Sequence, residues 1–402
     1  MLPLELDLIQ TLAVAAVVFL AGMSLRKRIA VLDRFNIPSA VVGGLVFATL
    51  VLIARDRFLN LTFTTTAQSL FNVAFFTTIG MSASLALLRA GGMQVALFLA
   101  FSTAFCFVQN FIGMGISQLF GVNPLLGVIA GSVTLVGGPA TGMAFAPIFT
   151  QAGVPGADTL ALAAATFGIV CGGLTGGPVG TRLIKQYNLR SSSKSTKELK
   201  EQLTTPVSEL VIDTEREDST LITNMIVLGI AMGIGSIVSR YIQNAGYILP
   251  AYIGAMAVAS VFRNIDDYTR WFKIDPKAME FIGGLALNIF LVVALMDLKL
   301  WQLVQLAIPL FTILIVQVIV IAIFAFVASY RIMGSDYDSA VMASGFIGFA
   351  LGTTANAMAN MRAIVNKYGP APRAFLIVPL VGAFFIDFVN SWIITFFVNW
   401  LR

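Results

Sequence analysis

The chain has 402 residues, of which 58% are hydrophobic and 11% are charged. A soluble chain carries about 25% charged residues, so this composition predicts a protein that crosses a membrane many times. The absence of histidine from the sequence excludes histidine-based metal sites and Ser–His or Cys–His catalysis. The net charge of +5 comes without a basic patch of interleaved aromatic residues, so nucleic acid is not an expected partner.

Apolar runs divide the chain into two halves around one polar segment. The first half has runs at about 7–25, 39–54, 67–88, 93–119, 124–150 and 158–181, and the second has runs at about 220–239, 246–262, 279–297, 302–330, 337–366 and 374–399. Small and polar residues interrupt the fifth run of each half. We therefore expect an N-terminal repeat over 1–184, a linker over 185–219 and a C-terminal repeat over 220–402.

Landmark residues recur in the same order in the two halves. Apolar segments always align loosely with one another, but a nearly constant separation of polar and proline landmarks favours an internal duplication. The matching pairs, each separated by about 210 residues, are Ile37-Pro38 with Leu249-Pro250, Asn72 with Asn288, Gln109 with Gln317, and Thr141 with Thr354.

The interrupted runs can be interpreted in two ways. As full spans they give six spans per half and parallel repeats, whereas as segments that enter and leave on one side they give five spans and inverted repeats. The second interpretation, with both termini outside and the linker in the cytoplasm, puts most of the 25 Lys and Arg residues inside. We therefore predict an all-α polytopic membrane protein with two inverted-topology repeats, each of five transmembrane helices plus one re-entrant hairpin at 124–150 or 337–366.

The first interrupted run contains Gly137-Gly138-Pro139, followed by Thr141. Backbone amides cannot stay unpaired in hydrocarbon, so a broken helix is tolerated only where it lines a cavity or is buried in protein. A half-helix that starts at this point offers free N–H groups and the positive end of its dipole, and both attract anions. The alternative is that the glycines only let helices pack closely.

The second interrupted run offers a turn at Gly352, the hydroxyls of Thr353 and Thr354, and the amide of Asn356. Hydroxyl, amide and carbonyl oxygens also suit a dehydrated sodium ion. Two such breaks in matching halves of a membrane protein are typical of a transport site.

Asp387 lies deep in the last run, and Asn390 follows three residues later on the same helix face. A carboxylate at that depth costs about 2.5 kcal/mol or more, so it is usually paired or functional. We expect its partner to be a sodium ion or the ammonium group of a substrate. The alternative is a neutral carboxyl that bonds to neighbouring helices.

Longer motifs add a family resemblance. They are Ala74-Phe-Phe-Thr-Thr-Ile-Gly80, Leu88-Arg-Ala-Gly-Gly92, Ala165-Thr-Phe-Gly168, Gly172-Gly-Leu-Thr-Gly-Gly-Pro178, Leu298-Lys-Leu-Trp301 and Val378-Pro-Leu-Val-Gly-Ala-Phe-Phe-Ile-Asp387. Through these motifs the chain resembles the glutamate:sodium symporter family from end to end. The resemblance implies a homodimer whose protomers each have a scaffold part and a transport part with two inverted re-entrant hairpins. It also implies that glutamate crosses with sodium by an elevator-like movement.

The chain departs from the family pattern in both interrupted runs. The family's first hairpin often reads Gly-Gly-His-Gly-Thr-Gly, where this chain has Gly137-Gly-Pro-Ala-Thr-Gly142. The second hairpin often carries a histidine where this chain has Phe346. Substrate contacts of those histidines are therefore not carried over. We expect spans three to five and eight to ten to form the moving part with the hairpins, and spans one, two, six and seven to form the scaffold.

We predict a secondary active symporter of the bacterial inner membrane that takes up L-glutamate with Na⁺ as the coupling ion. The alternatives are a sodium-coupled carrier for another amino acid or for a di- or tricarboxylate, a channel, and an intramembrane enzyme, which would need a second deep carboxylate beside Asp387. The candidate substrate-binding residues are Ser132, Gly137, Gly138, Thr141, Thr353, Thr354, Asn356 and Asp387, and the candidate sodium ligands are Asp387, Asn390, Asn356 and Thr134.

Overall fold

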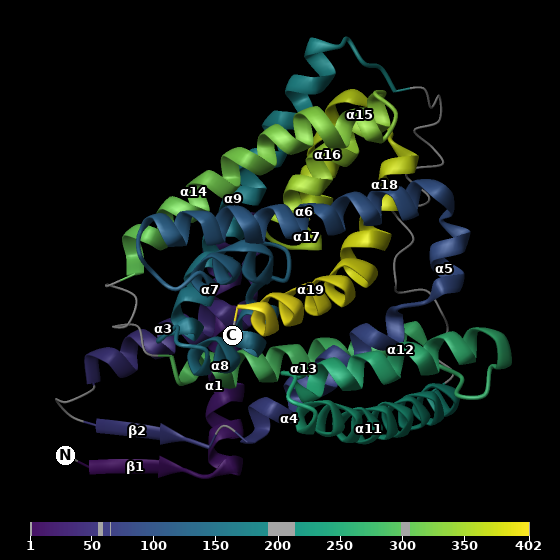
Figure 1. Cartoon of the computed structure of the whole chain (residues 1–402). Coiled ribbons are helices and arrows are strands. Elements are labelled where there is room, and N and C mark those ends of the chain that lie inside the picture. Colours follow the sequence, from purple (N-terminus) through teal and green to yellow (C-terminus); the bar gives the residue numbers. More distant parts are fainter. Residues whose placement is uncertain (1, 55–58, 65, 192–213, 299–305, 402) are drawn as a thin grey trace.

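The computed structural model describes residues 2–54, 59–64, 66–191, 214–298 and 306–401 (Figure 1). Most of the predicted linker, 185–219, lies outside these residues, because the description stops at 191 and resumes at 214. Long helices dominate the described part of the chain. They form two layers, and most helices of the first lie in the lower part of Figure 1 and most of the second in the upper part, although α8 lies low, beside α13.

The first layer is built from helices of both halves of the sequence. Helix α4 packs on α12 and α13, α11 packs on α12, and α1 packs on α3. The helices of this layer are α1 (Leu8–Arg28), α3 (Ser39–Ala54), α4 (Thr66–Ser82), α11 (Thr214–Asn244), α12 (Ala251–Thr269) and α13 (Pro276–Met296).

The second layer holds both interrupted runs. Helix α9 lies at its centre and contacts α8, α14, α16 and α17, while α6 contacts α14, α18 and α19. The helices of this layer are α6 (Gly92–Leu119), α7 (Leu125–Val128), α8 (Gly138–Gln151), α9 (Ala157–Gln186), α14 (Ala307–Phe324), α15 (Tyr330–Ile332), α16 (Tyr337–Ala350), α17 (Thr354–Tyr368), α18 (Pro372–Leu380) and α19 (Ile386–Trp400). Three π-helical turns, Ile129–Val133, Ala325–Ser329 and Val381–Phe385, interrupt them.

The layering corrects one sequence-based expectation. Spans three and eight, which are α4 and α13, were expected to belong to the same part of the protein as the interrupted runs. They pack instead on each other and on α3 and α12, so the first layer has six long helices rather than four within the described residues. The neighbours of a membrane helix depend on small and polar residues of distant segments, so the local sequence of α4 and α13 does not tell the layer to which each belongs.

Two short strands and two short helices complete the fold. Strand β1 (Leu2–Leu6) pairs in parallel with β2 (Leu59–Phe63), an arrangement that the apolar runs did not predict. The first long helix then starts at Leu8, where Asp7 and Gln10 form a reciprocal capping box. The short helices are α2 (Ala30–Arg34) and α5 (Leu85–Ala90).

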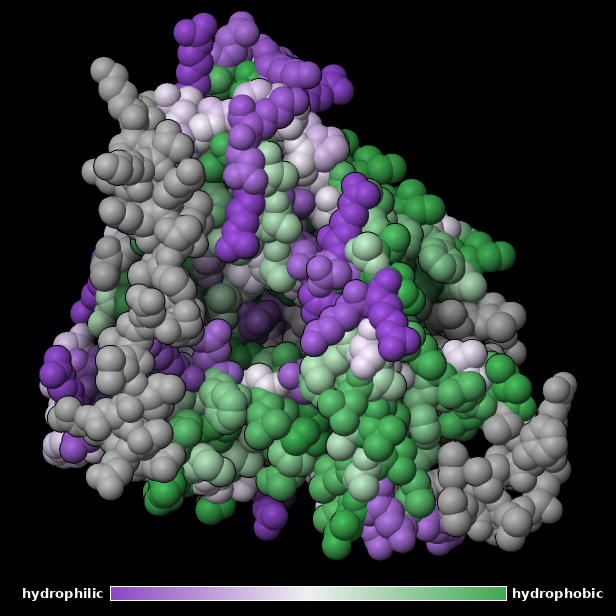
Figure 2. All heavy atoms as spheres, turned by 180° about the vertical axis from the view of Figure 1, so that it is seen from behind, coloured by the Kyte–Doolittle hydropathy of each residue, from purple (hydrophilic) through white to green (hydrophobic). Residues whose placement is uncertain are grey.

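The described helices are those of a multi-pass membrane protein. Six of them are long and apolar enough to cross a membrane, and a seventh span results if the pair Pro372–Ala383 and Ile386–Trp400, bent by 42°, is counted as one. Figure 2 shows apolar atoms over a broad area of the lower half of one face, while hydrophilic atoms gather toward its upper margin. Large side chains such as Ile222, Ile230 and Ile237 are exposed along α11, as lipid contact requires.

Glycine contacts recur at matching places in the two halves. A Cβ atom on Gly22 would lie 2.8 Å from the backbone nitrogen of Gly43, so α1 and α3 touch through their backbones. In the second half, a Cβ on Gly235 would lie 2.7 Å from the carbonyl carbon of Gly254, so α11 and α12 touch in the same way. The duplication inferred from the sequence therefore has a counterpart in how these helices pack.

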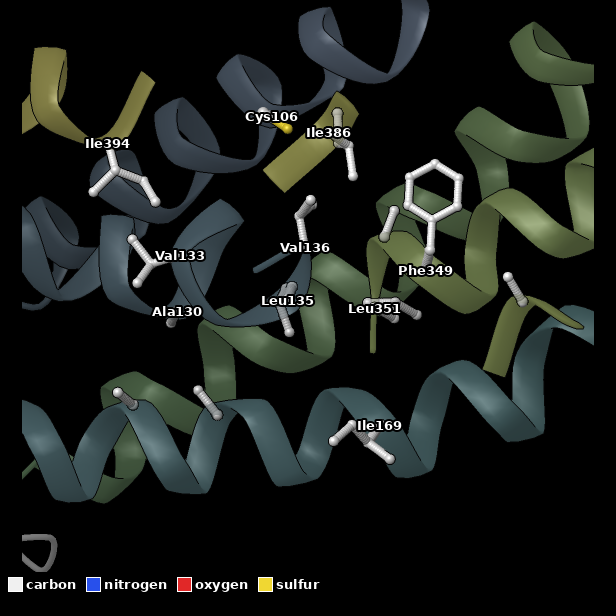
Figure 3. Close-up of a cluster of buried hydrophobic side chains, with 14 of the residues drawn as sticks. Cys106, Ala130, Val133, Leu135, Val136, Ile169, Phe349, Leu351, Ile386 and Ile394 are labelled. Atoms are coloured by element: carbon white, nitrogen blue, oxygen red, sulfur yellow. The ribbon is translucent and has the colours of Figure 1, made fainter. Parts of the chain in front are cut away.

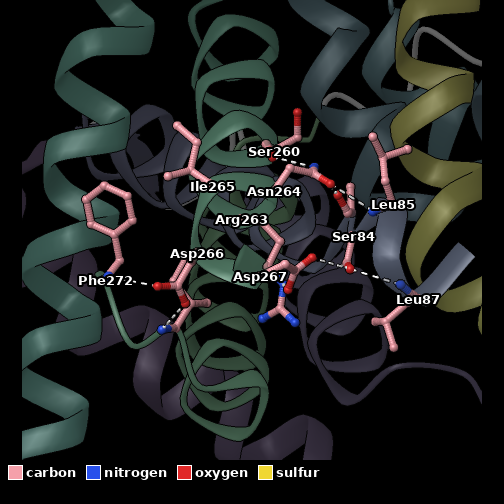
Figure 4. A network of polar contacts seen from close by, with 12 residues as sticks. Ser84, Leu85, Leu87, Ser260, Arg263, Asn264, Ile265, Asp266, Asp267 and Phe272 are labelled. Atoms are coloured by element: carbon pink, nitrogen blue, oxygen red, sulfur yellow. Dashed lines mark hydrogen bonds and ion pairs between the residues drawn. The ribbon is translucent and has the colours of Figure 1, made fainter. Parts of the chain in front are cut away.

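Polar contacts join the end of α12 to the connection between the layers (Figure 4). Asn264 Oδ1 accepts a hydrogen bond of 2.9 Å from the Leu85 N–H at the start of α5, and the Ser84 hydroxyl donates to Asp267. The Asp267 carboxylate is also paired with Arg263 at 3.0 Å. Helix α5, which leads from α4 into α6, is thus held against the first layer.

Candidate functional site

The first interrupted run contains two irregular points. Gly131 has φ −103° and ψ −131° inside the π-helical turn, which ends the incoming helix. Helix α8 then begins at Gly138, whose φ of +64° favours glycine, and Pro139 follows in its first turn, as predicted. We call residues 131–138 the first break. Both irregular points lie within 124–150, the run that the sequence marks as interrupted.

The second interrupted run breaks where the sequence indicated. Helix α16 ends at Ala350 and α17 begins at Thr354, and we call residues 351–353 the second break. Thr353 is the N-cap of α17, and its hydroxyl accepts a hydrogen bond of 3.4 Å from the Asn356 N–H. A Cβ on Gly352 would lie 3.0 Å from Cα of Ile169, so close packing with α9 requires glycine here.

The two breaks meet in the interior of the second layer. A Cβ on Gly138 would lie 3.5 Å from the carbonyl oxygen of Gly352, so the start of α8 is in contact with the second break. Figure 3 shows Leu135 of the first break beside Leu351 of the second, both above Ile169 of α9. The starts of α8 and α17 therefore lie near one another among apolar side chains, although their residues are more than 200 positions apart in the sequence.

A buried polar group surrounds the first break. Asn110 Oδ1 accepts a hydrogen bond of 2.9 Å from the Ser132 N–H, and Asn390 Nδ2 donates one of 2.8 Å to the Ser132 carbonyl. All three side chains are 0% exposed. The structure thus brings Ser132 and Asn390, both predicted site residues, together with Asn110, which the sequence did not single out.

The remaining predicted residues of the first break lie in the same region. Thr134 is fully buried, and its hydroxyl donates 2.6 Å to the carbonyl of Ile129, which leaves its oxygen able to accept a second contact. Thr141 is also buried, and its N–H donates 3.3 Å to the Gly137 carbonyl. A Cβ on Gly137 would lie 2.5 Å from the Thr141 hydroxyl, so this turn of α8 needs glycine.

At the second break the polar side chains are engaged with backbone. The Thr354 hydroxyl donates 2.7 Å to the carbonyl of Gly382. Asn356 Nδ2 donates 2.7 Å to the carbonyl of Ile169, and Asn356 Oδ1 accepts 3.2 Å from Asn36 Nδ2 of the first layer. Asn36 was not predicted, because nothing in its local sequence indicates a contact with a residue 320 positions away.

Asp387 lies in the first turn of α19, half-buried. Its backbone carbonyl accepts a hydrogen bond from the Ser391 hydroxyl, but the structure gives its carboxylate no hydrogen bond or ion pair with any residue that it describes. The alternative of a carboxyl bonded to neighbouring helices therefore has no support among those residues. Asp387 precedes Asn390 by one helical turn, as the sequence predicted.

A row of glycines fits α9 against the second break. A Cβ on Gly168 would lie 2.2 Å from the carbonyl oxygen of Leu351, and one on Gly176 would lie 2.8 Å from that of Ser344. Gly172 and Gly180 continue the row at four-residue intervals. Close packing, the alternative weighed for the glycines of the breaks, is thus the role of these residues of α9.

Phe346, which stands where the family often has a histidine, is 0% exposed within α16. Its ring lies 4.9 Å from that of Phe101 and 5.3 Å from that of Phe105, both in α6, and 6.3 Å from that of Phe324 in α14. This residue therefore packs the second interrupted run onto α6 and α14. Phe346 therefore has a packing role in this chain.

Two hollows flank α8 on the side that faces the first layer. One, of about 660 Å³, is lined by residues of α4, α8 and α12 that include Asn72, Ala144 and Tyr252. The other, of about 450 Å³, is lined by Gln68 and Asp158 among others. Two lining residues of the first hollow are bonded to each other, because the Tyr252 hydroxyl donates 3.4 Å to the carbonyl of Ala144 in α8.

A helical membrane protein in which two interrupted helices meet at their breaks has the build of a secondary transporter. The family model described as sodium/glutamate symporter matches residues 4–370. Curated proteins named sodium/glutamate symporter are similar over nearly the whole chain. Those of Escherichia coli (strain K12) and Shigella flexneri are 37% identical over 397 residues, which is 98% of each chain. That of Haemophilus influenzae is 38% identical over 386 residues, which is 95% of each chain.

The chain belongs to the sodium/glutamate symporter family. The resemblance read from its motifs is thereby confirmed. The family is one of transporters, and this excludes the alternative of an intramembrane enzyme that uses the carboxylate of Asp387.

Proposed function

We propose that this protein takes up L-glutamate across the membrane together with sodium. The observation that carries the proposal is the contact between the two breaks, because it brings the starts of α8 and α17 together in the protein interior. Each start presents N–H groups without partners in its own helix and a positive dipole end. Glutamate has two carboxylates, and two converging helix starts fit that charge pattern.

Glutamate recognition is assigned to groups of both breaks. The hydroxyls of Thr141, Thr353 and Thr354 and the backbone of Gly137 and Gly138 are proposed to bind its carboxylates. Ser132 and Asn356 are proposed to contribute at the same site. Asp387 is proposed to receive the ammonium group or a sodium ion, and its unpaired carboxylate supports either role. Because no histidine exists in the chain, these groups carry the recognition.

Sodium is the proposed coupling ion. Its candidate ligands are Asp387, Asn390, Asn356 and Thr134, and the unpartnered Oδ1 atom of buried Asn390 supports this set. If sodium completes the site, each solute binds more tightly when the other is present, and transport of one requires the other.

The architecture we propose is that of two inverted repeats, 1–184 and 220–402, joined by a cytoplasmic linker at 185–219. Each repeat has five transmembrane helices and one re-entrant hairpin, at 124–150 and 337–366, and both termini lie outside. The recurring glycine contacts of α1 with α3 and of α11 with α12 support the duplication. The distribution of Lys and Arg supports the orientation.

The proposed movement is elevator-like, within a homodimer in the bacterial inner membrane. The separation into two layers supports it, because the second layer holds both breaks and the first holds neither. Such a movement would break the contacts Asn36–Asn356 and Tyr252–Ala144, which join the layers.

Purified protein in liposomes tests the proposal. We expect uptake of labelled glutamate when sodium is higher outside than inside, and no uptake when choline replaces sodium. Uptake that ignores the sodium gradient would contradict sodium coupling. Competition by unlabelled aspartate, citrate and 2-oxoglutarate separates glutamate from the alternative substrates. Citrate would inhibit a tricarboxylate carrier more than glutamate does, 2-oxoglutarate would do so for a dicarboxylate carrier, and aspartate for a carrier of that amino acid.

A further inference from the structure

Three buried amide side chains have oxygens without partners. Gln109 of α6, Gln317 of α14 and Asn390 of α19 are all 0% exposed. Within the described part of the chain, Gln109 Oε1, Gln317 Oε1 and Asn390 Oδ1 have no hydrogen-bond partner. A buried polar atom without a partner costs about 1–3 kcal/mol, so three of them in one region require an explanation.

The orientation of each amide is set by its nitrogen. Gln109 Nε2 donates 3.0 Å to the Ala350 carbonyl, and Gln317 Nε2 donates 2.6 Å to the Gln109 carbonyl. Asn390 Nδ2 donates 2.8 Å to the Ser132 carbonyl. Exchanging oxygen and nitrogen would place an oxygen against a carbonyl oxygen in every case, so the three oxygens cannot satisfy themselves by rotation.

Hydrogen bonds, together with the chain link between Gln109 and Asn110, connect these residues into one cluster. Gln317 bonds to the backbone of Gln109, whose neighbour Asn110 bonds to Ser132, and Ser132 bonds to Asn390. The cluster also reaches the second break, because Gln109 bonds to Ala350 at the end of α16. A Cβ on Gly131 would lie 3.3 Å from the Gln109 carbonyl oxygen, which brings the first break against the same residue.

Two further atoms of the cluster lack partners. Besides the three amide oxygens, the Ser132 hydroxyl and Asn110 Nδ2 have no hydrogen-bond partner among the described residues. Buried oxygens that accept no hydrogen bond from the protein are satisfied by a bound cation or by a water that donates its hydrogens. A site of neutral oxygens without a carboxylate suits a monovalent ion. A divalent ion favours charged ligands instead.

We propose that this cluster is a sodium site, with Gln109, Gln317, Asn390 and the Ser132 hydroxyl as its oxygen donors. The inference rests on the proposed sodium coupling and extends it to α6 and α14, whose glutamines occupy matching positions in the two halves. An ion here contacts residues bonded to both breaks. Its binding therefore holds the two helix starts in the geometry that glutamate requires, which gives sodium a physical means of raising glutamate affinity.

Thermal unfolding of the purified protein in NaCl, against KCl and choline chloride at equal ionic strength, measures sodium binding without transport. We expect sodium alone to raise the unfolding temperature in a saturable manner. Gln109→Met and Gln317→Met remove the amide, and with it both the oxygen and the Nε2 bond to backbone, with little change in volume. They should raise the half-saturating sodium concentration about tenfold or more, in unfolding and in uptake. Ser132→Ala, which deletes only an unpartnered hydroxyl, should raise it without loss of folding.

Asn72→Leu is the matched control. Asn72 is a buried amide of α4 with an unpartnered oxygen, but it lies in the first layer, so its loss should leave the half-saturating sodium concentration unchanged. If all three cluster variants keep the wild-type sodium dependence, the oxygens are satisfied by water and the site does not exist. If sodium stabilises the wild type through this cluster but uptake ignores sodium, the site stands and the proposed coupling fails.

Discussion

Asn36 of the first layer donates a hydrogen bond of 3.2 Å to Asn356, whose own Nδ2 atom donates 2.7 Å to the carbonyl of Ile169 in α9. Asn356 therefore joins the start of α17 to a helix of its own layer and to the opposite layer at once. Asn36 has a φ of +53°, a left-handed conformation that asparagine tolerates better than most residues. The contact is thus built from a residue type suited to its backbone.

A double-mutant cycle on Asn36→Ala and Asn356→Ala should detect this bond. We expect a coupling of about 0.5–1.5 kcal/mol, the usual net contribution of one neutral hydrogen bond. The measurement is thermal or denaturant unfolding in detergent for the wild type, both single variants and the double variant. Strictly additive effects would show that the two side chains do not interact in the purified protein.

The glycine row of α9 predicts a position-dependent effect of a single methyl group. Gly168→Ala would bring a Cβ within 2.2 Å of the Leu351 carbonyl oxygen, and overpacking of this kind costs about 1–3 kcal/mol. Gly177→Ala, on the same helix, meets no atom of the described chain within 4 Å and is the control. We expect a lower unfolding temperature for Gly168→Ala than for Gly177→Ala. Equal temperatures would mean that α9 and α16 are not in backbone contact.

The capping role of Thr353 can be separated from its proposed role in binding. Thr353→Ala should lower the stability of the protein by about 0.5–2 kcal/mol, because the Asn356 N–H loses its side-chain acceptor. Thr353→Ser keeps the hydroxyl and should restore wild-type unfolding. If the serine variant is as unstable as the alanine variant, the methyl group rather than the cap supports α17.

Asp387→Asn removes the unpaired charge of α19 while preserving shape. We expect the half-saturating sodium concentration for uptake to rise by about tenfold or more, or uptake to cease, because a carboxylate in the membrane interior binds a cation far better than an amide does. Asp33→Asn is the control, since Asp33 is an exposed residue paired with Arg26. A transporter with normal sodium dependence and normal rate after Asp387→Asn would exclude this residue from the site.

The breaks could be predicted from the sequence because their signals are local. Gly138 supplies a positive φ, Pro139 suits the first turn of a helix, and Thr353 is a common N-cap residue. Each preference arises from the residue and its immediate neighbours. The starts of α8 and α17 therefore fell at the expected residues.

The partners of the site could not be predicted, because they depend on packing between distant segments. The sequence around Asn110 and Asn36 does not indicate their partners, Ser132 and Asn356, which only the fold brings close. The layer to which α4 and α13 belong was wrongly assigned for the same reason. A membrane helix can pack against many neighbours, and the small residues of both partners, which lie far apart in the sequence, select one of them.

The glycine row of α9 has a consequence for the leakage of sodium ions through the protein. Where Gly168 and Gly176 let α9 touch the carbonyls of Leu351 and Ser344, the two backbones approach too closely for a file of water molecules to pass between them. A carrier that uses a sodium gradient loses that gradient through any continuous wet path, so the seam beside its site must be dry. Glycine at these positions, by allowing this close contact, therefore favours a dry seam between α9 and α16.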